Sequence, residues 1–124
     1  MAVTYTTAVK NARLDAVVTA IGTTGVLEIG TTGMASVLVT INLNNPAGTT
    51  SGGVLTFSGF PKSDTSADNT GTAAAARIRT ASGGTDIITG LTVGLSASDI
   101  VLDSLSITAG QTVTISSATI THAA

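Results

Sequence analysis

The chain has 124 residues, of which 43% are hydrophobic, 10% charged and 2% aromatic, and its formal net charge is −2. This length suits one domain with one hydrophobic core, and the basic residues are scattered, so they form no positive patch for nucleic acid. No apolar run approaches the roughly 20 residues of a membrane-spanning helix, and a chain without cysteine has neither disulfides nor thiolate metal sites. We therefore expect neither nucleic acid nor a membrane as a direct partner.

Charged residues are so scarce that long parts of the surface must consist of hydroxyl, methyl and glycine groups. No charged residue lies between Glu28 and Lys62, and beyond Asp103 only His122 has a titratable side chain. Soluble monomers usually carry a mixed charged surface, with about a quarter or more of it Lys, Arg, Glu and Asp. The composition favours a surface that is covered by copies of the chain and by a larger assembly. The alternative is a monomer that Thr and Ser hydroxyls keep soluble.

Residues 6–21 carry a helical pattern. Apolar side chains recur there at three- and four-residue spacings, namely Val9, Leu14, Val17, Val18 and Ile21. Thr6 or Thr7 can cap this helix and Gly22 can end it. The opposite face carries Lys10, Asn11 and Asp15, as expected for a short helix that lies across the edge or face of a sheet.

From residue 25 onward the pattern is that of short strands separated by turns. Residues 26–29 predict a short strand between glycines, and residues 35–43 predict a longer one rich in branched side chains. Residues 44–48 predict a turn, because proline lacks the N–H that a central strand donates and Asn and Gly favour turn geometry. Another strand is predicted at 53–57.

The middle of the chain contains a polar passage and an ambiguous segment. Residues 58–70 predict an exposed loop. In residues 71–80 four consecutive alanines favour a helix, whereas their neighbours suit a strand. We predict a strand, in which the small side chains at 73–76 let another sheet or subunit come close and Arg77 and Arg79 share one face.

The last third of the chain predicts further short strands. The Ser-Gly-Gly-Thr sequence at 82–85 is typical of a hairpin turn into a strand at 86–89. Short strands follow at 91–95 and 100–102.

The clearest alternation of apolar and polar residues lies at the end of the chain. Leu105 and Ile107 precede a turn at 109–111, and near-alternate apolar residues follow at 113–122. This pattern predicts a half-buried hairpin. The alternation breaks at residues 116–117, which predicts a β-bulge or a shift of register.

About seven or eight short strands after one helix predict a mainly β fold, a β-sandwich or jelly-roll-like domain with one short N-terminal α-helix. We expect residues 1–124 to form a single domain, with the helix at 6–21 and a β-rich body at 25–124. No internal repeat of solenoid or propeller length is present.

The sequence offers few residues for catalysis. Its one histidine, His122, continues the pattern of the last strand, so we expect a packing or interface role rather than a place in a catalytic triad. Neither a nucleophile elbow nor a phosphate-binding or dinucleotide-binding glycine motif is present. We therefore predict a protein that is not an enzyme and uses no cofactor.

Two pairs of carboxylates were compared with the spacings of metal-binding loops. Asp64 and Asp68 lie near Asn69 and a glycine, but the alternating ligands and closing Glu of a calcium-binding loop are absent. Asp99 and Asp103 flank a strand candidate, which favours a solvated strand face or a turn boundary. We predict no metal site at either pair.

Four segments resemble small structural proteins of tailed bacteriophages, and the likeness covers most of the chain. They are Tyr-Thr-Thr-Ala-Val-Lys at 5–10, Leu-Glu-Ile-Gly-Thr-Thr-Gly-Met-Ala at 27–35, Gly-Thr-Ala-Ala-Ala-Ala-Arg-Ile at 71–78 and Ile-Thr-His at 120–122. Among such proteins we favour a capsid decoration, or cement, protein. The resemblance implies a small, β-rich oligomer that binds the outside of the phage head across gaps between capsomers.

That resemblance implies the major capsid protein as a partner, further copies of the chain in a dimer or trimer, and a place on the exterior of the virion. The first residues lack the features of a secretory signal, so synthesis in the host cytoplasm is expected. The residues that we nominate for the interfaces come from the apolar helix face, the alanine segment and the C-terminal strands: Val9, Leu14, Val17, Ala74, Ala76, Val113, Ile115 and Ile120. Pairing of edge strands between subunits is a further possibility.

Two alternatives stay open. The first is another virion part, such as a tail, neck or fibre-associated protein. The second is a module that binds a carbohydrate or a cell surface. Sugar sites usually stack aromatic rings on the ligand, and this chain has only Tyr5, Phe57 and Phe60, so the second alternative is disfavoured.

Overall fold

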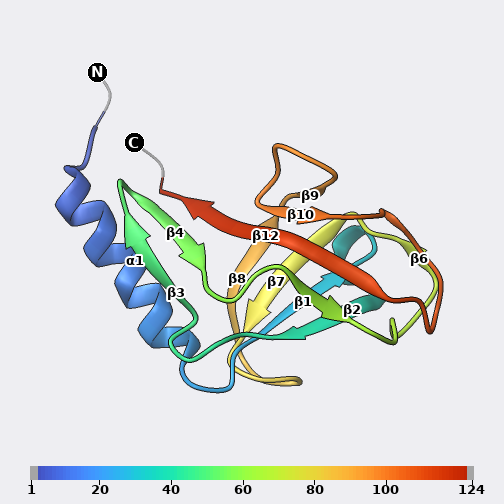
Figure 1. The fold of residues 1–124 in the computed structure, drawn as a ribbon. Helices are drawn as coiled ribbons and strands as arrows, with labels where there is room; N and C mark the ends of the chain where they lie inside the picture. The colour runs from blue at the N-terminus through green and yellow to red at the C-terminus, as the bar shows by residue number, and fades with distance from the viewer. Residues whose placement is uncertain (1–2, 123–124) are drawn as a thin grey trace.

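The structure is a computed structural model and describes residues 3–122 (Figure 1). Strands make up 42% of it and helix 15%, in three sheets and one α-helix within the described residues. The predicted class, a mainly β, sandwich-like domain with one N-terminal helix, is confirmed.

The first sheet has four antiparallel strands. Their spatial order is β2 (Val37–Asn42), β1 (Val26–Gly30), β7 (Ala75–Arg79) and β8 (Asp86–Leu91). The predicted hairpin turn at 82–85 joins β7 to β8, and Thr80 N–H donates to Thr85 O across it at 3.0 Å. The strand predicted for residues 71–80 is confirmed by β7 over Ala75–Arg79, whereas Ala73 and Ala74 lie outside any strand.

The second sheet is built around the last strand. Its spatial order is β3 (Gly48–Ser51), β4 (Val54–Phe57), β12 (Val113–Thr121), β10 (Ile100–Leu102) and β9 (Val93–Gly94), and β5 (Lys62–Asp64) pairs with the first part of β12. Only β9 and β10 run parallel in this sheet. A small third sheet joins β6 (Gly71–Thr72) to β11 (Ser106–Ile107). One short 3-10 turn, η1 (Thr32–Met34), connects β1 to β2.

One hydrophobic cluster joins the two large sheets. Leu27 and Ile29 alternate along β1 and have no exposed surface, and Ile115 on β12 is equally covered. Alternate side chains of a strand point to opposite faces, so the inward set of each sheet meets the inward set of the other. The core therefore lies between the sheets.

The helix α1 (Thr7–Ile21) lies against the β3–β4 hairpin and near β8 (Figure 1). Thr6 caps its start, because its side-chain oxygen accepts the Val9 N–H at 3.3 Å, and Gly22 ends it with a φ of 77°. The helix buries Leu14 and Ile21. It thus covers one end of the sandwich (Figure 1).

The polar residues predicted on the other face of this helix contact the β3–β4 hairpin. The Asn11 side chain accepts the Gly53 N–H at 2.9 Å, and the Lys10 stem lies over Gly53. The third residue, Asp15, is exposed but accepts the Thr50 hydroxyl at 2.8 Å. The β3–β4 hairpin offers polar backbone groups to the helix, so polar side chains lie in this contact.

Three strand predictions are corrected. The strand β5 lies inside the predicted 58–70 loop, because β12 extends beyond β4 and offers free pairing positions there. The strand β3 begins at Gly48, the end of the predicted turn. The predicted hairpin of Leu105 and Ile107 with the last strand does not form, because β11 pairs with β6 instead.

The irregularity predicted at residues 116–117 is confirmed. Ser117 pairs with Val101 and Ile115 pairs with Leu102, so Ser116 is an extra residue on β12. The bulge keeps both Ile115 and Ala118 buried although they are three residues apart.

Candidate functional site

Almost all charged side chains of this protein make contacts within its own fold. The chain has 12 charged residues, five basic plus seven acidic. Eleven of them make an ion pair, a hydrogen bond or a cation–π contact. The twelfth, Lys10, packs its aliphatic stem against Gly53. The structure therefore gathers few charges for a ligand.

The largest charge cluster lies on the outer face of the first sheet. Glu28, only 5% exposed, places Oε1 2.7 Å from Arg77 Nε and 3.8 Å from an Arg79 Nη. Arg79 Nε lies 2.8 Å from Asp86 Oδ1 but lacks hydrogen-bond alignment with it. The predicted shared face of Arg77 and Arg79 is confirmed by their common partner, Glu28.

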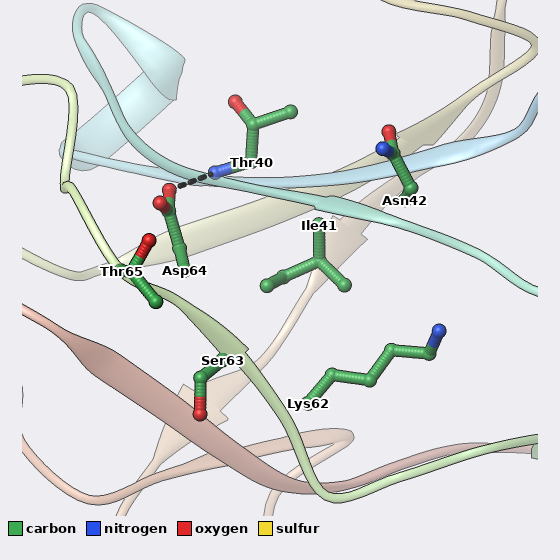
Figure 2. A pocket seen from close by; sticks show the side chains of 7 residues that line it. All are labelled: Thr40, Ile41, Asn42, Lys62, Ser63, Asp64 and Thr65. Atoms are coloured by element: carbon green, nitrogen blue, oxygen red, sulfur yellow. Dashed lines mark hydrogen bonds between the residues drawn. The ribbon is translucent and has the colours of Figure 1, made fainter.

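Asp64 and Asp68 lie along the seam between β2 and β5, where the two large sheets meet at one edge. Asp64 accepts the Thr40 N–H at 3.1 Å and the Ser66 N–H at 3.0 Å, while Asp68 accepts the Thr40 hydroxyl at 3.0 Å. Figure 2 shows the Asp64 carboxylate turned toward the backbone of Thr40. The two carboxylates thus satisfy donors at the unpaired edge of β2.

A polar pocket of about 340 Å³ opens beside this seam. Figure 2 shows its lining residues, Thr40, Ile41, Asn42, Lys62, Ser63, Asp64 and Thr65. The Lys62 ammonium is held by the Asn44 side chain at 2.7 Å, so the one cation of the pocket already has a partner. The charged side chains of the pocket, Lys62 and Asp64, therefore bond to neighbouring groups along the seam and not to a common central site.

Asp99 and Asp103 hold the two ends of β10. Asp99 accepts the Thr92 N–H at 3.0 Å while its own N–H donates to the Thr92 hydroxyl at 2.9 Å, and Asp103 accepts the Thr114 N–H at 3.2 Å. These contacts fit the predicted turn-boundary role. Within residues 3–122, no group of three or more His, Asp or Glu side chains comes together as a metal site requires.

His122 packs at the end of β12. The His122 ring lies edge-on to the Tyr5 ring with centroids 5.8 Å apart. The backbone N–H of His122 donates to the Gly53 carbonyl oxygen at 2.9 Å. The Arg13 guanidinium lies 4.8 Å from the centre of the same Tyr5 ring. These contacts join the start of the helix to the end of the last strand.

The nominated interface residues divide into three groups. Leu14, Ala76, Val113 and Ile115 are buried in the core of their own chain. Val17 and Ile120 are half-buried and pack against that core. The exposed members are Val9 and Ala74.

An apolar pocket of about 410 Å³, which we call the outer pocket, lies on the outer face of the first sheet. It is lined by Gly33, Met34, Ala75, Ala76, Arg77, Asp86, Thr89 and Gly90. Met34 forms one wall, because η1 folds its side chain over Gly30, where a Cβ would lie 3.0 Å from Met34 Cε. The small residues of the alanine segment were expected to let a neighbour approach, and Ala75 lies in this hollow. The sequence did not indicate that Met34 and Gly90 would stand beside it.

No helix within residues 3–122 has the length and apolar character needed to cross a membrane. No protein-family model, curated protein or solved structure matches this chain.

Proposed function

We propose that this chain is a non-enzymatic structural protein of a bacteriophage virion, a capsid decoration protein that binds the major capsid protein on the outer surface of the head. The observation that carries the proposal is the use of the charged side chains. Eleven of 12 hold the fold together, so hydroxyl, methyl and glycine groups dominate the remaining surface. Such a surface has little to keep neighbouring molecules apart.

The contacts of the acidic side chains support the same role. Each carboxylate described above accepts from a loop, a strand edge or an arginine of the same chain. A rigid sandwich with its strand ends held in this way suits repeated geometric contacts, in which many modest interfaces of about 800 Å² per partner act together. The resemblance of four segments to phage structural proteins is the reason for proposing a phage head as the larger assembly.

A decoration protein acts through differential affinity. A clamp that binds the expanded shell but not its precursor stabilises the expanded form, and many weak copies suffice. A chain of this size without cysteine suits synthesis in the host cytoplasm and addition to a finished shell.

Counting copies in purified virions tests the proposal. Quantitative mass spectrometry of particles should give a copy number close to that of the major capsid protein, and cryo-electron microscopy should place the chain on the outside of the head. A handful of copies at the tail or neck would replace the decoration role by the tail or neck alternative. Absence from particles would overturn the proposal.

A further inference from the structure

The loop that joins β9 to β10 carries an exposed leucine. Leu95 is 59% exposed, and its immediate neighbours in the chain are small residues. The loop projects from the body of the sandwich (Figure 1, orange). The other large exposed apolar side chains of the described chain are Val3, Tyr5 and Val9, on the N-terminal arm and the first turns of the helix.

The outer pocket is a matching depression on the same molecule. Its walls are Met34 on one side and Thr89 and Gly90 on the other, and its floor includes Ala75. Arg77 and Asp86 reach its rim, but each is already paired, with Glu28 and Arg79 respectively. An apolar side chain is therefore a better occupant than a charged one. Leu95 does not line this pocket in its own chain.

An uncommon backbone conformation occurs both at the outer pocket and in the β9–β10 loop. Among residues 3–122 the non-glycine residues with positive φ are Met34, at 58°, and Ala97, at 52°. This conformation crowds the Cβ and is uncommon for such residues, so it persists only where the surrounding structure holds it in place. Met34 forms the wall of the pocket and Ala97 lies two residues from Leu95.

We infer that a second copy of this chain inserts Leu95 of its β9–β10 loop between Met34 and Gly90 of the outer pocket. The size of the contact argues for a copy rather than a different protein. One leucine and its loop cover much less than the roughly 800 Å² per partner of a stable complex. In a closed symmetric oligomer each chain contributes its loop once and its pocket once, so the small contact is at least doubled.

The charges of the loop and of the outer pocket agree with this pairing. Residues 95–98 carry no charge, and the one acid that follows them, Asp99, is held by Thr92. The four charges around the pocket, Glu28, Arg77, Arg79 and Asp86, sum to zero. Neither surface therefore leaves an unpaired charge when it is covered. The inference deepens the proposed function and rests on it only for the biological setting of the oligomer.

Disulfide trapping tests the contact directly, because the natural chain has no cysteine. Ser96→Cys, which leaves Leu95 in place, and Thr89→Cys are purified separately, one of them with a size tag, and then mixed under mild oxidation. A mixed 96–89 disulfide can form only between chains. It should form about tenfold or more faster than the disulfide between Ser96→Cys and a control, Thr19→Cys, on the exposed side of the helix, because docking raises the local thiol concentration. Equal rates would overturn the inference.

Sedimentation of the full chain gives a second readout. Leu95→Asp should weaken self-association about tenfold or more, since burial of one leucine side chain contributes at least that much. Ala12→Asp, at an exposed helix residue outside the nominated interfaces, should leave it unchanged. If Leu95→Asp has no effect and a Val9→Asp or Val3→Asp variant weakens association instead, the N-terminal arm is the contact and the inference is wrong. All of these measurements use the isolated chain. A chain that self-associates through Leu95 but is absent from virions would therefore overturn only the proposed function.

Discussion

Arg77 Nε donates to Glu28 Oε1 at 2.7 Å between directly paired positions of β7 and β1. Glu28 is the one polar or charged residue among the buried side chains of the described chain. Arg77 and Arg79 both place positive charge beside this carboxylate. The pair therefore adds a side-chain contact to the backbone pairing of β1 with β7.

Replacement of Glu28 by glutamine should cost about 2–4 kcal/mol of stability, because Arg77 loses its counter-charge beside a buried site and Arg79 keeps only Asp86. The Glu28 side chain is 6% exposed and those of the arginines 21%, so the loss falls somewhat below that of a fully buried pair. Asp86→Asn is the matched control, since the Asp86 side chain is 43% exposed. It should cost under about 1 kcal/mol. Urea denaturation measures both, and a larger loss for Asp86→Asn would contradict this account.

The contact between Asn11 and Gly53 attaches the helix to the β3–β4 hairpin. Asn11→Ala should destabilise the protein by about 1–3 kcal/mol, because the part-buried Gly53 N–H loses its acceptor. Thr19→Ala, on the exposed side of the same helix, should change stability by no more than about 0.5 kcal/mol. Thermal unfolding gives the comparison. Equal midpoints for Asn11→Ala and the wild type would mean that the apolar contacts alone hold the helix.

Asp64 closes the seam by accepting two backbone N–H groups. Asp64→Asn keeps only one acceptor oxygen, so we expect a loss of about 1–2 kcal/mol and faster hydrogen exchange at the Thr40 amide. Asp68→Asn should have a smaller effect, because the amide oxygen of asparagine can still accept the Thr40 hydroxyl. Amide exchange followed by NMR distinguishes the two variants. Unchanged protection of Thr40 in Asp64→Asn would show that the seam is held by other contacts.

Gly48 lies where β3 begins its pairing with β4. An added Cβ would fall on the carbonyl oxygen of Thr56 and 3.0 Å from the Phe57 Cα, and backbone atoms cannot move aside. Gly48→Ala should therefore cost about 2–3 kcal/mol. Gly71→Ala is the control, since its Cβ would meet only the ends of the Thr31 and Leu38 side chains, at 3.0 and 3.3 Å. Chemical denaturation should give a clearly smaller loss for Gly71→Ala, and the reverse order would refute the steric explanation.

The local pattern of the sequence was enough for the helix and for most strands. The spacing of Leu14 and Ile21 gave the helix its buried side, and the break near Ser116 marked the bulge. Both features depend on residues a few positions apart, so a periodicity records them. The strand β5 was not predicted, because Lys62, Ser63 and Asp64 are all polar and only these three residues pair with β12.

The candidate sites could be predicted far less well. The wall of the outer pocket at Met34 and its opposite side at Gly90 are 56 residues apart in the chain, and β7 brings them together. The carboxylates Asp64 and Asp68 were recognised as a pair, but their partner, Thr40, lies on another sheet. A sequence pattern carries no record of such long-range neighbours.

The sequence by itself determined that the chain is poor in charge and that one helix precedes many short strands. Composition is a property of the whole sequence, and the period of apolar residues depends only on residues near one another in it. Only the tertiary structure decided what covers each apolar residue. Val113 and Ile115 were nominated for contact with a partner, and they meet the core of their own chain. Leu95 was not nominated, and it is exposed. Hydrophobic patterning shows that a side chain tends to be buried, and the packing of the two sheets decides which side chains remain for a second molecule.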